Sequence, residues 1–133
     1  MHHLGLFAAQ FLVAAFLAVL FLQSGLDKVL DWAGNRAYID SVFAKTPLKS
    51  LSAAMLGVIT LMEVGSGVLS AAGALSVLVT RDTTFALAGA VLSGLSILSL
   101  FFGQRIARDY AGAAGLVPYF LVTVVGMLVD AQR

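Results

Sequence analysis

The side chain with the clearest chemical potential is Glu63, the only charged residue in the apolar run from Leu51 to Val79. It lies about twelve residues, or roughly 18 Å of helical rise, from the start of that run, which predicts a position near the middle of a bilayer. A carboxyl group there costs roughly 2.5–3.5 kcal/mol unless it is protonated, paired or next to a wet cavity. Glu63 is therefore a candidate for proton transfer or for a hydrogen bond to a polar ligand head such as a quinone carbonyl. The alternative is a protonated acid that holds two helices together.

A second charged group ends the first apolar run, in the sequence FLQSGLDKVLDWAGN at residues 21–35. If the helix continues through this stretch, Lys28 and Asp31 face each other, and the cation relieves the repulsion between Asp27 and Asp31. Exposed pairs of this kind contribute only about 0–1 kcal/mol, so spacing alone favours a solvated helix end. Gln23 and the serine after it lie one turn deeper, and a polar track could run from them toward the bundle interior.

The rest of the chain offers little for catalysis or metal binding. It has no cysteine, its two histidines are adjacent at positions 2 and 3, and it has no Ser/His/Asp set, Walker loop or GxGxxG motif. We expect no catalytic residue, no metal site and no cofactor bound by this chain alone. A quinone is the one cofactor to consider, with four candidate residues for quinone binding or proton transfer: Glu63, Lys28, Gln23 and Asp27.

The composition identifies the solvent around these residues. The chain has 133 residues, of which 60% are hydrophobic and only 11% are charged. A soluble domain carries roughly 25% charged residues, so this chain is expected to face the lipid bilayer. The net charge of +1 is too small to indicate a nucleic-acid partner. The length suits a single domain, residues 1–133.

Four runs are long enough to cross a membrane, since a spanning helix needs about 20 mainly apolar residues. They lack the alternating pattern of barrel strands, which predicts an all-α, polytopic membrane four-helix bundle. The second run is longer than a perpendicular span requires, so it could tilt, project or break near Gly65-Ser66-Gly67. Pro118 is expected to kink the fourth run. The predicted spans are about 4–26, 51–79, 83–104 and 111–129.

The loop between the first two spans contains a short apolar pattern. Tyr38, Ile39, Val42 and Phe43 fall on one helical face, and the tryptophan and tyrosine of this loop suit the headgroup region. We predict a short interfacial helix, with an irregular loop as the alternative.

Positive charge predicts the orientation. One side of the predicted bundle carries most of the cations, so the positive-inside rule places both termini outside the cytoplasm. The cations on that side are Lys28, Arg36, Lys45, Lys49, Arg105 and Arg108, against Arg81 and Arg133 on the other.

Small residues recur at helical spacing in the spans and predict close helix packing in lipid. The serines at 93, 96 and 99 are expected to bond to their own helix or to a neighbour. The glycines expected to contribute to packing are Gly25, Gly65, Gly67, Gly89 and Gly94.

Two stretches resemble DoxX-like membrane proteins. "FLQSGLDKVLD" at 21–31 is similar to the end of that family's first helix, and "MEVGSGVLSAAG" at 62–73 to its second-helix pattern. The resemblance carries Gly25, Lys28, Glu63, Gly65 and Gly67 over as motif positions; Ser66 stands where a glycine pair would often be contiguous. The family is named after a small subunit of an archaeal terminal quinol oxidase, and relatives are linked to thiosulfate–quinone electron transfer.

Together these features favour an accessory membrane subunit of a quinone-linked respiratory or redox complex. It would have no catalytic activity alone and would dock against larger membrane oxidoreductase subunits, in a prokaryotic inner membrane. One alternative is a purely structural or assembly protein. The other is a small solute carrier that acts as an oligomer.

Overall fold

The computed structural model describes residues 2–132, and all the regular structure in this range is helical. The all-α prediction is therefore confirmed. The elements are α1 (His2–Leu30), α2 (Trp32–Phe43), a 3-10 turn (Lys49–Leu51), α3 (Ser52–Thr80), α4 (Thr84–Ile106), α5 (Tyr110–Gly115) and α6 (Val117–Asp130).

Four helical segments are long and apolar enough to cross a membrane, which confirms the four predicted spans. Large apolar side chains on their outer surfaces are exposed, including Leu61, Leu121 and Phe102. Such a surface suits acyl chains rather than water, so the fold is consistent with an integral membrane protein. The segments are His3–Leu30, Lys49–Thr80, Thr84–Ile106 and Tyr110–Asp130.

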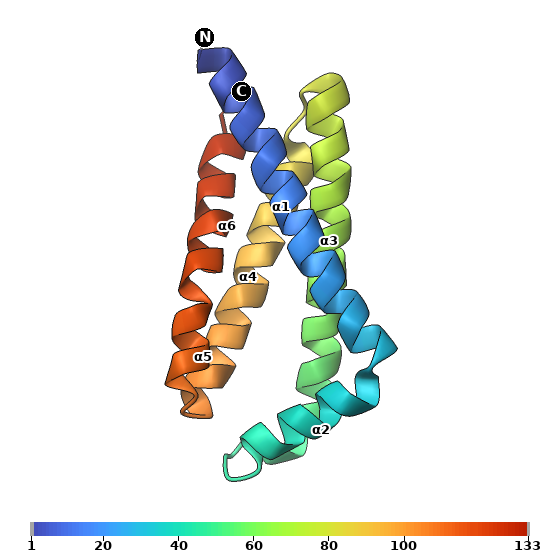
Figure 1. The fold of residues 1–133 in the computed structure, drawn as a ribbon, viewed down its shortest axis with the longest axis vertical. Coiled ribbons are helices and arrows are strands. Elements are labelled where there is room, and N and C mark those ends of the chain that lie inside the picture. Colours follow the sequence, from blue (N-terminus) through green and yellow to red (C-terminus); the bar gives the residue numbers. More distant parts are fainter. Residues whose placement is uncertain (1, 133) are drawn as a thin grey trace.

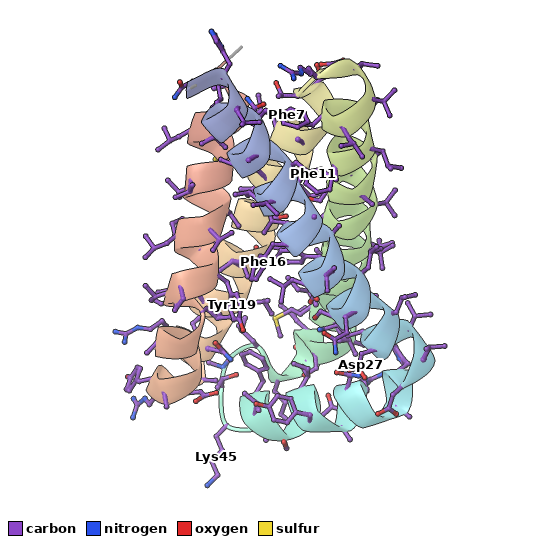
Figure 2. All side chains as sticks on the ribbon, turned by 45° about the horizontal axis from the view of Figure 1, so that its top comes forward. Phe7, Phe11, Phe16, Asp27, Lys45 and Tyr119 are labelled. Carbon is purple, nitrogen blue, oxygen red and sulfur yellow. The ribbon has the colours of Figure 1, made fainter. Side chains whose placement is uncertain are left out.

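The long helices pack as a bundle in which α1 lies against α3, α3 against α4, and α4 against α6 (Figure 1). α6 also touches α1, and α1 reaches α4. Both ends of the chain lie at the same end of the bundle, and α2 crosses the opposite end. Near the start of α6 the ring of Tyr119 stacks with that of Phe16 in α1, with centroids 6.5 Å apart (Figure 2).

Close helix contacts depend on glycine. A Cβ placed on Gly67 would lie 2.7 Å from the backbone nitrogen of Leu22, where α1 crosses α3. A Cβ on Gly73 would collide with the backbone of Ala86, where α3 meets α4. Because backbone atoms cannot move aside as side chains can, these glycines set the distance between the helices.

Two irregularities considered from the sequence have different outcomes. α3 is continuous through Gly65-Ser66-Gly67, so the second span does not break there. The fourth span does break, between Gly115 and Val117, directly before Pro118. Proline lacks an N–H for the helix ladder, and its ring crowds the carbonyl group four residues before it, which accounts for the break.

α2 is an ordered helix rather than an irregular loop. Asp31 caps it, accepting a hydrogen bond from the Gly34 N–H at 3.2 Å. At its other end Phe43 is buried and lies against Gly103 of α4. α2 therefore joins the end of α1 to α4 across one end of the bundle.

Candidate functional site

Glu63 of α3 forms an ion pair with Lys28 of α1. The Nζ atom of Lys28 lies 2.9 Å from Oε1 of Glu63, and the two side chains are 16% and 1% exposed. Lys28 also donates a hydrogen bond to Oγ of Ser24 at 3.0 Å. Oε1 of Glu63 is buried, and the Lys28 ammonium is the group that the described residues place beside it.

The approach of α1 to α3 explains why these two residues meet. A Cβ on Gly25 would lie 2.7 Å from Cγ2 of Val64 and 3.1 Å from its backbone nitrogen. Only glycine permits this contact, which brings α1 close beside Glu63. Lys28 is one turn further along α1, so its long side chain reaches the neighbouring carboxylate. The sequence-derived motif residues Gly25, Lys28 and Glu63 therefore lie together.

The pair lies level with the polar end of α1, because Lys28 is two residues before that helix ends. α3 extends past this level by the eleven residues that separate Ser52 from Glu63, about 16 Å of rise. The extra length of the second span therefore projects beyond α1, alongside α2. Glu63 is deep in its own helix but close to the end of the neighbouring one, which the sequence of α3 alone does not reveal.

The pairing of Lys28 with Asp31 that a continuous helix would allow does not form. The chain turns at Asp31, whose carboxylate caps α2, while Lys28 points to Glu63. Asp27 is exposed at the corner between α1 and α2 (Figure 2), where its Oδ2 accepts a hydrogen bond from Nδ2 of Asn35 at 3.4 Å. The charges at the end of α1 are thus divided between two helices and do not form one cluster.

The other candidate residues differ in placement. Gln23 and Asp27 are exposed and neither lies in the ion pair, whereas Ser24 joins it through Lys28. Gly65 lies opposite Leu92, and Gly94 opposite Met127. The polar track from the sequence analysis therefore runs through Ser24 and Lys28 to Glu63, without Gln23.

Buried hydroxyl groups continue along the α3–α4 contact. The side chains of Ser66 and Ser96 are fully buried, with their Oγ atoms 3.4 Å apart. Each also donates to a carbonyl oxygen of its own helix, at 2.6 Å and 2.9 Å respectively. Ser70 and Ser93 are equally buried and have no hydrogen-bond partner within residues 2–132. Because Ser70 fits against Gly89, α3 and α4 approach each other closely along this contact.

A polar junction at the opposite end of the bundle was not predicted. Gln10 of α1 donates hydrogen bonds to the carbonyl oxygens of Val129, at 2.8 Å, and Gln132, at 2.9 Å. Thr83 donates to the carbonyl oxygen of Asp130 at 2.7 Å. These bonds fix the end of α6 to α1 and to the α3–α4 turn. The available signal was Gln10 itself, a large polar residue inside an apolar span.

The described residues contain no group of three or more His, Cys, Asp or Glu side chains arranged to hold a metal ion. A cavity of about 220 Å³ lies between α4 and the α5–α6 break, with an entirely apolar lining. It is lined by Ile97, Leu98, Phe101, Leu116, Val117 and Phe120.

The fold and the site define the class of protein. It is a small all-helical protein with four helices long and apolar enough to span a membrane. A lysine–glutamate ion pair lies between two of these helices, α1 and α3. Comparison with protein-family models, curated proteins and solved structures finds no match to this chain. The resemblance to DoxX-like proteins stays a prediction.

Proposed function

We propose that this chain is an accessory membrane subunit of a quinone-linked redox complex and that the Lys28–Glu63 pair binds the polar head of the quinone. The observation that carries the proposal is a charge pair enclosed by apolar helices, with Glu63 1% and Lys28 16% exposed. Intramembrane ionisable groups are costly and tend to mark sites of function. Lys28 provides the accessible side of the pair.

The two side chains suit the chemistry of such a head group. A quinone takes up two electrons and two protons as it becomes a quinol. The Lys28 ammonium can donate a hydrogen bond to a carbonyl oxygen, and the Glu63 carboxylate beside it can accept one from a hydroxyl group. Glu63 can also hold a proton and exchange it with the head group. The electrons would come from a redox centre in a larger partner subunit, because this chain has no cysteine and only two adjacent histidines.

Quinone binding should depend on the charge pair. We expect a short-tailed probe, decyl-ubiquinone, to quench the fluorescence of Trp32, the only tryptophan, in the full chain reconstituted in nanodiscs. In the double variant Lys28→Met/Glu63→Met, the probe affinity measured by quenching should fall at least about tenfold. This is the effect expected from losing one or two charged hydrogen bonds.

The matched control removes the exposed ion pair of α2, in which Arg36 and Asp40 are 3.4 Å apart. The variant Arg36→Met/Asp40→Met should bind the probe as the natural chain does. Equal quenching of the natural chain and the Lys28→Met/Glu63→Met variant would refute the proposed site.

A structural role is the second candidate, and one observation favours it. The ion pair joins α1 to α3 directly beside the close contact of Gly25 with Val64, where it could fix the register of the two helices. In that case Glu63→Gln should lower the yield of the native complex, since it leaves the largely buried Lys28 ammonium without its anion. Loss of quinone content from an intact complex with this variant would favour the first candidate.

We also propose that α2 lies along the cytoplasmic surface of a prokaryotic inner membrane, with both termini outside the cytoplasm. Trp32 and Tyr38 are partly exposed on α2, as suits the headgroup region. Lys45 extends away from the bundle at this end (Figure 2), and the cations of both loops at this end support the same orientation.

Cysteine labelling tests this orientation without interference, because the chain has no cysteine. In intact cells a membrane-impermeant maleimide should label Ala131→Cys, near the end of the chain, but not Ser41→Cys in α2. Both residues are exposed in the fold, so both should react once the membrane is permeabilised. The reverse pattern in intact cells would contradict the proposed orientation.

A further inference from the structure

A small polar cavity lies at the terminal end of the bundle, away from the Lys28–Glu63 pair. It has a volume of about 90 Å³, roughly three times the ~30 Å³ that one water molecule takes up in the liquid. That is enough for a small polyatomic group and too little for a drug-sized ligand, which needs roughly 300–1,000 Å³. The lining consists of His3, Leu6, Phe7, Gln10, Arg81 and Gln132.

Arg81 is the charged group of this cavity, and its position is well defined. It ends α3 with a left-handed backbone (φ 59°), and its N–H donates to the carbonyl oxygen of Val77 at 3.1 Å. Its guanidinium carbon lies 4.6 Å from the centre of the Phe7 ring. The guanidinium carries five N–H donors in a planar fork, which suits an acceptor such as a phosphate oxygen.

The surroundings of Arg81 favour an anion. Among residues 2–132, no carboxylate lines the cavity, and the Lys28–Glu63 and Arg36–Asp40 ion pairs do not involve Arg81. Gln132 adds an uncharged side chain that can donate hydrogen bonds. The amide nitrogen of Gln10 is already committed to two carbonyl oxygens, so Gln10 shapes the wall.

The depth of the cavity favours a lipid as the source of that anion. Arg81 directly follows the candidate span that ends at Thr80, where phospholipid phosphates lie. Leu6 and Phe7 give the same cavity an apolar side that acyl chains can contact. A cation fixed at the end of a span, with apolar and polar walls, matches the border between a headgroup and its chains.

We infer that this cavity binds a phosphate group through the Arg81 guanidinium, and that in the membrane the phosphate belongs to an anionic phospholipid. Arginine recognises phosphate through charge-assisted, often paired hydrogen bonds. The inference is independent of quinone binding, since the cavity and the Lys28–Glu63 pair lie at opposite ends of the bundle.

Native mass spectrometry of the full chain in a neutral detergent tests it. Phosphatidic acid should bind at least about tenfold more tightly than diacylglycerol with the same acyl chains, because the two differ only in the phosphate and a charged hydrogen bond is worth about that factor. Arg81→Gln should remove most of this preference. Inorganic phosphate is added in a separate arm: displacement of phosphatidic acid at millimolar concentration would support the site while identifying free phosphate as a competing source.

Arg105→Gln is the matched control, because Arg105 lies over the Tyr110 ring at 4.5 Å at the other end of the bundle. It should keep the preference. Gln132→Glu provides a second variant that adds a carboxylate at an exposed position without altering a helix contact, and it should also abolish the preference. Equal binding of the two lipids, or equal losses in Arg81→Gln and Arg105→Gln, would overturn the inference.

Discussion

Lys28→Met is expected to lower the free energy of unfolding by about 3–5 kcal/mol, the usual cost of leaving a buried charge without its partner. Glu63 is 1% exposed, so its carboxylate would lose the cation paired with it and would remain out of contact with water. Replacement of both members, in Lys28→Met/Glu63→Met, should recover most of the loss, because apolar side chains of similar size need no compensation. The free energy of unfolding of the natural chain, the single variant and the double variant can be measured in mixed micelles of increasing SDS content. Trp32 fluorescence follows the unfolding.

The exposed pair on α2 is the control for this cycle. Arg36 and Asp40 are each 47% exposed, so Arg36→Met should cost no more than about 1 kcal/mol. If Lys28→Met and the double variant lost the same stability, the two charges would not be coupled, and the ion pair would have no part in holding α1 against α3.

The stability of the double variant also decides how the site can be studied. A chain that keeps its fold without the pair allows quinone binding to be lost while the bundle remains intact. The two proposed roles can then be distinguished. If the pair binds quinone, its removal lowers the affinity for the probe; if the pair is structural, its removal lowers the free energy of unfolding. Glu63→Gln tests the proton dependence, since its amide cannot release a proton, and its free energy of unfolding is measured alongside because Lys28 loses its anion.

The sequence was sufficient for the features that depend on one helix at a time. Apolar runs of about 20 residues predicted the four spans, which the structure confirms, and Pro118 marked the break before α6. Glu63 was recognisable because a charge inside such a run is rare. Each of these signals is local, so no knowledge of the neighbouring helices was needed.

Features that depend on the register between helices were not predictable. Helical spacing pointed Lys28 toward Asp31, but the chain turns at Asp31 and the lysine reaches Glu63, 35 positions away. That contact follows from the approach of Gly25 to Val64, which no periodicity in either helix specifies. The bonds from Gln10 to the end of α6 likewise join opposite ends of the chain.

The second large expected loss of stability comes from a substitution in the contact between α3 and α4. Gly73→Leu is expected to destabilise the bundle by about 3 kcal/mol or more, at or beyond the upper end of the usual cost of overpacking. A Cβ on Gly73 would meet the Cα, N and Cβ atoms of Ala86, and backbone atoms of a helix cannot move aside singly. α3 and α4 would have to separate, which would also open the buried contact between Ser66 and Ser96.

Gly5→Leu is the matched control, because a Cβ on Gly5 has no atom within 4 Å and the same side chain is added to a helix in both variants. It should leave the midpoint of the SDS titration nearly unchanged. Gly73→Ala should give an intermediate loss, since it adds only the colliding carbon. Equal midpoints for the two leucine variants would mean that α3 and α4 separate at little cost, and that the glycine does not determine how closely these helices pack.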